Sequence, residues 1–205
     1  MKELVKALIE KHKEEMAAAL SKMLGGGTLP IDAIARYTLA FAGPFTDLLG
    51  KTGPWVRHER ARYAISDNLR CEQSEDHVGM LFEFADACGV TFTHEHHRAI
   101  AQEMQALRNL MRNVNTAGLS GLTVLTLLEN ISEVFIPELE RAAVALSVAN
   151  LTYTQVHGVA DQEHSNAFTI ALEAELGCGY DQPEKLVQQA AEVTMNLLHA
   201  VFGTR

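Results

Sequence analysis

Two histidines and an aspartate recur at positions i, i+4 and i+7 in one stretch of the chain. They are His157, Asp161 and His164, and they lie in a segment of residues 150–175 that has the apolar periodicity of a helix. Each helical residue turns by about 100°, so the three side chains point the same way to within about 60°. Two imidazoles and a carboxylate on one face are a typical ligand set for iron or zinc.

A solvated polar helix face is the alternative explanation of this triplet. Tyr153 and Phe168 fall on the same face, however, and such aromatic neighbours predict that the face is buried. Buried imidazoles and carboxylates need partners because an unpaired polar group loses its hydration. A metal ion would be a natural partner for the group.

The bulk composition predicts a single globular domain. The chain has 205 residues, 47% of them hydrophobic and 21% charged, which is enough for one domain with a substantial core. The net charge of −9 argues against a nucleic-acid or anionic membrane surface. Three scattered cysteines without a CxxC pair suit a reducing compartment. The N-terminal segment does not resemble a signal peptide and no apolar run approaches a membrane span, so we expect a cytoplasmic protein.

Helical periodicity and helix-breaking residues predict about seven helices and no strand. The resulting fold class is an all-α, single-domain bundle that takes in residues 1–205. In the first helix the predicted inward stripe consists of Leu4, Leu8, Met16, Leu20 and Met23. The predicted helices span residues 2–23, 30–49 with a kink at Pro44, 55–72 with its continuation over 77–88, 94–114, 119–148, 150–175 and 183–202.

A change of helical face predicts a break between Gln73 and Asp76. The inward stripe of the preceding helix ends at Glu72, and the next apolar stripe starts at His77. On one straight helix two residues five apart diverge by about 140°. An interruption would restore a continuous apolar face and bring Glu72 and His77 to the same side, whereas a rotated but continuous helix would not.

The helix over residues 119–148 supplies two further candidate ligands. Glu129 and Glu133 both lie on a stripe that otherwise looks inward, together with Leu122, Thr126 and Ile136. We prefer Glu129 because it lies deeper in the helix, but both glutamates remain candidate ligands.

These segments together resemble the haem-oxygenase-like di-iron oxidases. The run from Tyr153 to Phe168, with its His-x3-Asp-x2-His spacing, is similar to the last core helix of that family. The run 67–72, followed by His77, resembles its second ligand segment, and residues 27–37 resemble its entry helix. The resemblance implies a haem-oxygenase-like bundle that binds two non-haem iron ions and uses O2 to oxidise a small organic substrate. It implies a ligand set of Glu72, His77, Glu129 or Glu133, His157, Asp161 and His164.

Two other functions remain open at this point. The segment 133–139 also resembles the pyrroloquinoline-quinone synthases, which are cofactor-free oxidases. The thiaminase-II enzymes are relatives of these synthases. A non-catalytic helical interaction protein with a vestigial pocket is the third possibility, and metal content separates the first function from the other two. We expect a small-molecule substrate and no nucleic-acid or membrane partner, and we allow for a homodimer.

Overall fold

Helices account for nearly all regular structure in the computed structural model, which describes residues 2–204 except for the side chains of residues 159–161. No strand occurs within that range, so the predicted all-α class is confirmed. The described helices number nine α-helices and one 3₁₀ turn rather than about seven. Their bounds are α1 Lys2–Leu24, α2 Ile31–Phe41, α3 Pro44–Thr52, η1 Gly53–Trp55, α4 Glu59–Ser74, α5 His77–Ala87, α6 His94–Leu110, α7 Ala117–Ala145, α8 Thr152–Glu175 and α9 Pro183–Phe202.

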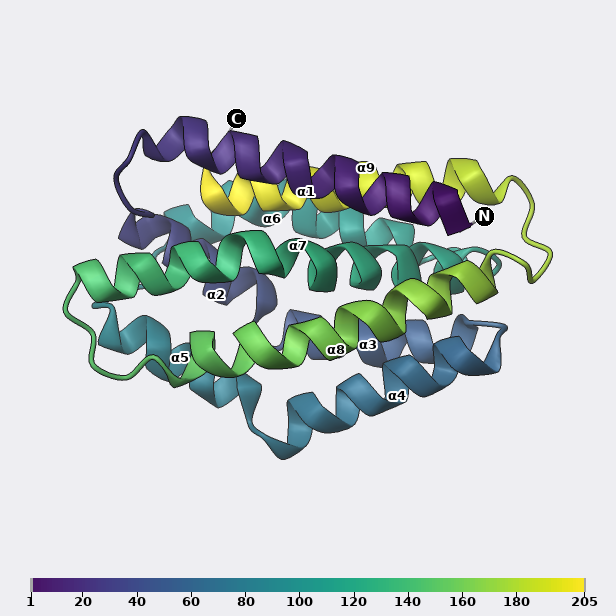
Figure 1. Cartoon of the computed structure of the whole chain (residues 1–205), viewed down its shortest axis with the longest axis horizontal. Coiled ribbons are helices and arrows are strands. Elements are labelled where there is room, and N and C mark those ends of the chain that lie inside the picture. Colours follow the sequence, from purple (N-terminus) through teal and green to yellow (C-terminus); the bar gives the residue numbers. More distant parts are fainter. Residues whose placement is uncertain (1, 205) are drawn as a thin grey trace.

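The two longest core helices, α7 and α8, pack against each other along the middle of the bundle (Figure 1). Helices α1 and α9 cover α7 on one side, while α4 and α5 contact α8 on the other. Helix α8 therefore lies between α7 and the α4–α5 segment, which is the arrangement that the candidate ligands predict.

The kink predicted at Pro44 is a complete break. Gly43 has a φ of 86°, in a region that residues with a Cβ rarely adopt, and Pro44 then starts α3. Because of this break, one predicted helix is the two helices α2 and α3.

The predicted interruption between Gln73 and Asp76 is confirmed. Helix α4 ends at Ser74, and Asp76 adopts a left-handed conformation with φ 50° and ψ 47°. The Asp76 side chain then caps α5 by accepting a hydrogen bond from the Gly79 N–H at 3.1 Å. A Cβ at position 79 would lie 2.3 Å from Asp76 Oδ2, so a larger residue there would displace the cap.

Helix α7 forms the centre of the core and is buried on nearly every side. It is the described helix that is long and apolar enough, with a mean hydropathy of 1.4 over its most apolar window, to cross a membrane by composition. In this bundle 89% of that window is buried by other helices. The apolar character of α7 is therefore accounted for by its central position.

The stripe predicted for α1 is displaced in part. Met16 and Leu20 are buried as expected, but Val5 and Ile9 face the core in place of Leu4 and Leu8. Leu4 is 37% exposed. At about 100° per residue, Val5 lies within about 20° of the face of Met16, whereas Leu4 diverges from it by about 120°, so the spacing to Met16 favours Val5.

Candidate metal centre

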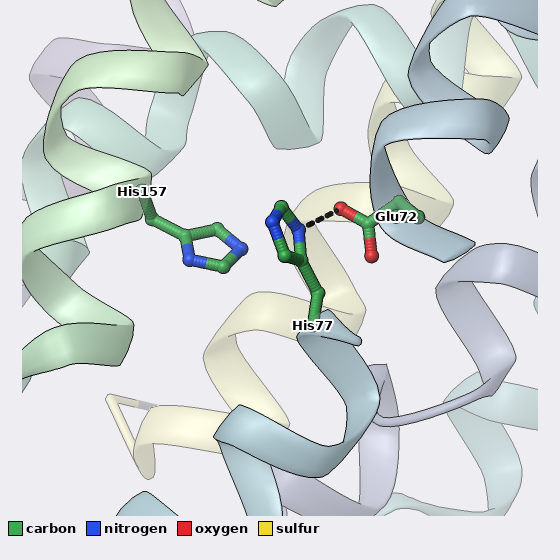
Figure 2. A group of neighbouring side chains, drawn as sticks. All are labelled: Glu72, His77 and His157. Atoms are coloured by element: carbon green, nitrogen blue, oxygen red, sulfur yellow. Dashed lines mark hydrogen bonds and ion pairs between the residues drawn. The ribbon is translucent and has the colours of Figure 1, made fainter. Parts of the chain in front are cut away.

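Three helices bring two imidazoles and one carboxylate together inside the bundle. Glu72 comes from the last turn of α4, His77 is the first residue of α5, and His157 lies in α8. One potential ligand atom from each residue lies within 4.8 Å of the others. Figure 2 shows His157 reaching from α8 towards the His77 ring, which lies between it and Glu72. The cluster therefore depends on three segments that are distant in sequence or separated by a helix break.

The break after α4 sets the contact between Glu72 and His77. His77 Nδ1 lies 2.8 Å from Glu72 Oε1, and its Nε2 lies 3.0 Å from Glu75 Oε2. The His77 side chain is 3% exposed, and that of Glu72 10%. Burial alone would lower the pKa of His77, but the hydrogen bonds and charges of Glu72 and Glu75 outweigh it and raise that pKa. Without metal, His77 therefore tends to carry a proton between two carboxylates.

His157 is held in the opposite protonation state. Its Nδ1 lies 2.8 Å from the Tyr153 carbonyl oxygen, which can only accept, so Nδ1 carries the proton and Nε2 keeps its lone pair. Burial lowers the pKa of His157, although the bond to Tyr153 opposes the shift. A neutral imidazole with one nitrogen fixed by a carbonyl is the state in which histidine binds metals.

Glu129 lines the same cavity from α7. It is 5% exposed and accepts a hydrogen bond from Asn68 Nδ2 at 2.6 Å. Glu129 is not part of the group formed by Glu72, His77 and His157. Glu129 therefore lines the cavity beside that group without belonging to it.

The structure places Glu133 away from the cavity. Its side chain is 38% exposed, and its Oε2 lies 2.6 Å from Lys13 Nζ of α1. The sequence kept Glu133 as a candidate because it lies four residues after Glu129. The structure does not bring it to the other candidates, because α7 presents it to α1 at the surface.

The two remaining candidates on α8 are His164, whose side chain is described, and Asp161, whose side chain is not. His164 is half-buried, and burial lowers its pKa while Glu72, Asp67 and His77 act on its charge. His164 is outside the group of close ligand atoms formed by Glu72, His77 and His157. The side chain of Asp161 lies outside the described residues, so its predicted role stays a prediction. Tyr153 and Phe168, which predicted a buried face, are 4% and 0% exposed.

The donor set fits a ferrous ion. Two histidines with one carboxylate are the ligands of many non-haem Fe(II) sites. Ligand atoms about 2.1 Å from one metal lie at most about 4.2 Å apart. The observed 4.8 Å spread thus requires only small side-chain rotations to close on an ion. The residues present are compatible with iron in type and in position.

An apolar cavity of about 60 Å³ adjoins the cluster. A volume of roughly 15 Å³ per water suggests room for about four water molecules. Two tyrosines in its wall, Tyr37 and Tyr153, share a hydrogen bond of 2.7 Å between their hydroxyl groups. The other lining residues are mostly apolar and come from α2, α3, α5, α7 and the connection between α2 and α3: Phe41, Ala42, Phe45, Val78, Leu81, Leu128, Ser132 and Phe135.

Comparison with known proteins agrees with this chemistry. A family model described as iron-containing redox enzyme matches residues 32–197, which include every candidate ligand. The chain belongs to this family. No curated protein matches the sequence significantly. Membership in the iron-containing redox enzyme family also supports the haem-oxygenase-like fold and a redox activity in general.

The sequence analysis did not identify the hydrogen bond between Asn68 and Glu129. The residue was visible in the run 67–72, one helical turn before Glu72 and therefore on the same face. That spacing was the available signal. The partner on α7, 61 residues away, could not be identified from periodicity alone.

Proposed function

We propose that this iron-containing redox enzyme is an O2-activating, non-haem di-iron oxidase or oxygenase that acts on a small organic substrate. The observation that carries the proposal is the buried cluster of Glu72, His77 and His157 next to an apolar cavity. Glu129 in the wall of the same cavity, together with Asp161 and His164 as predicted from the sequence, would supply the donors that a second ion needs.

In this proposal the protein residues hold the ions and control the protons. Bound ferrous ions would supply the electrons that reduce O2, and the chain supplies the ligands and the enclosed site. His157 is ready to bind through Nε2 because the Tyr153 carbonyl fixes its tautomer. His77 must first give up a proton and one of its carboxylate contacts, so metal binding releases protons to solvent.

The cavity restricts what reaches the ions. Its walls are mainly apolar side chains, which favour an apolar substrate over bulk water. With about 60 Å³ of space, the cavity admits O2 and a small group but not a large molecule without side-chain movement. We therefore infer a substrate whose reacting end is small and apolar.

The test is an anaerobic ferrous titration of the wild type and two histidine variants. We expect about two equivalents bound to the wild type, proton release on binding, and a melting temperature that rises with iron concentration. His157→Ala should weaken binding at least about tenfold, since changes even outside the ligands cost roughly 10- to 100-fold. His97→Ala, at an exposed position on α6, should behave as the wild type.

An O2-consumption assay completes the test. Iron-loaded wild type should consume O2 faster with a competent substrate than without it, and iron-free protein should not. Wild-type protein that shows neither iron binding nor a change in melting temperature would contradict the proposal. O2-dependent oxidation by protein free of metal would instead favour the cofactor-free function.

A further inference from the structure

A buried amide joins α4 to α7 beside the candidate metal centre. Asn68 is 1% exposed and lies one turn before Glu72 on the inward face of α4. Its Nδ2 donates a hydrogen bond to Glu129 Oε1 at 2.6 Å. Its Oδ1 is buried and accepts no hydrogen bond from the described residues.

The acceptor role of the Glu129 side-chain oxygen accounts for this orientation of the amide. An ionised carboxylate only accepts hydrogen bonds, so the NH2 end of Asn68 must face it. A hydrogen bond to a charged group is stronger than one between neutral groups. The cost is the Oδ1 acceptor at the other end, which has lost its hydration without gaining a partner. The structure thus retains Asn68 for its contact with Glu129 at the expense of its own second polar atom.

A second buried asparagine shows what an amide with a packing role looks like in this bundle. Asn130 is 8% exposed and follows Glu129 in α7. Its Nδ2 lies within hydrogen-bonding distance of Thr126 O, Ser165 O and Thr169 Oγ1, so it links α7 to α8. Asn130 thus contacts several neutral acceptors, whereas Asn68 donates to one carboxyl oxygen of Glu129.

We propose that Asn68 is a positioning residue that holds the Glu129 carboxylate in place as a ligand of the second metal position. This inference rests on the proposed di-iron function. A glutamate side chain has three rotatable torsions, and a fixed donor on one oxygen limits the orientations that its carboxylate adopts. Because Glu129 is outside the group of Glu72, His77 and His157, losing Asn68 should affect one iron equivalent and spare the other.

The test compares Asn68→Leu with Asn130→Leu, which makes the same chemical change at two buried asparagines. Anaerobic ferrous titration should give two equivalents for the wild type and for Asn130→Leu. In Asn68→Leu one equivalent should keep wild-type affinity, and the other should weaken by roughly 10- to 100-fold. Asn130→Leu should instead lower the melting temperature of the iron-free protein, because it breaks contacts between α7 and α8.

Cobalt substitution gives a readout that is independent of turnover. Co²⁺ in place of iron reports the ligands of each position through its visible absorption. Asn68→Leu should change the spectrum of the second equivalent and leave that of the first unchanged. If Asn68→Leu does not fold, Asn68→Ala removes the same donor with less bulk, and the same loss of one equivalent is expected.

The outcomes separate this inference from the function on which it rests. Two equivalents of unchanged affinity and spectrum in a folded Asn68 variant would overturn the role of Asn68 and leave the di-iron proposal standing. Equal losses in the Asn68 and Asn130 variants would also overturn it, because the effect would then be general. A wild type that binds no iron would remove the di-iron function, and the positioning role would fall with it.

Discussion

A carboxylate lies at each end of α4, Glu175 of α8 beside its start and Glu72 in its last turn, but the two carboxylates have different surroundings. At the N-terminal end, Glu175 is 0% exposed and accepts hydrogen bonds from the backbone N–H groups of Arg57 and His58, each at 2.7 Å. Tyr180 donates a third hydrogen bond to it. At the C-terminal end, Glu72 faces His77 in a pocket shared with His157.

The difference teaches how to distinguish a structural acid from a functional one in this fold. Glu175 is surrounded by fixed donors that belong to the same chain, including backbone amides just before the start of α4, where a negative charge is favourable. Glu72 meets the imidazoles of His77 and His157, which are candidate metal ligands, and the site opens onto a cavity. The first arrangement is complete without a ligand, whereas the second gains from a cation.

Removing Glu175 should have the largest effect on stability. Glu175→Ala leaves two backbone N–H groups and the Tyr180 hydroxyl without their acceptor, and we expect a loss of about 3 kcal/mol. For a chain of this size the melting temperature should fall by roughly 6–12 °C. Thermal unfolding measures the loss, and a ferrous titration below the transition should still count the wild-type number of ions. If Glu175→Ala loses iron but keeps its stability, Glu175 contributes to iron binding and its structural role is wrong.

Glu72→Gln should give the opposite pattern. The glutamine keeps a side-chain oxygen for His77, so the iron-free protein should lose no more than about 1 kcal/mol. Iron affinity should fall by at least roughly 10- to 100-fold, because the variant lacks an anionic ligand. Unfolding and titration on one preparation make the comparison with Glu175→Ala direct. A folded variant with wild-type iron affinity would exclude Glu72 from the site.

The Tyr180 hydroxyl gives the N-terminal end of α4 its own pH dependence. Burial raises the pKa of Tyr180, and the hydrogen bond to Glu175 raises it further. A pKa raised in the folded state contributes stability that is fully present below the unfolded value, near 10, and is lost as the pH rises through the folded value. Tyr180→Phe should lower the free energy of unfolding by about 1 kcal/mol at neutral pH. As the pH rises above about 10, the variant should lose less stability than the wild type. Melting curves of both proteins from neutral to alkaline pH check this, and parallel curves would contradict it.

The smallest effect is expected from Glu133→Gln. This change breaks a partly exposed ion pair with Lys13, which should cost between about 0 and 1 kcal/mol. Iron binding should stay at the wild-type level, whereas Glu129→Gln should lose one equivalent. Titrating the two variants side by side decides between the glutamates. A loss of iron in Glu133→Gln alone would return Glu133 to the ligand set.

The sequence by itself determined the all-α class, most of the helices and, to within a few residues, many of their ends. The change of face after Glu72 located the break at Asp76, and the predicted last helix over residues 183–202 has the bounds of α9, Pro183–Phe202. These features depend on local backbone preferences and on periodicity, which neighbouring residues encode. For the same reason the chain predicted that Glu72 and His77 lie on one side.

Only the tertiary structure decided which side chains meet across the bundle. Helix α7 is buried on nearly all sides, so its periodicity could not separate Glu129 in the cavity from Glu133 beside Lys13. The contact between Asn68 and Glu129 joins residues 61 positions apart. Local sequence sets the face on which a residue lies, but the partner on that face depends on how whole helices pack.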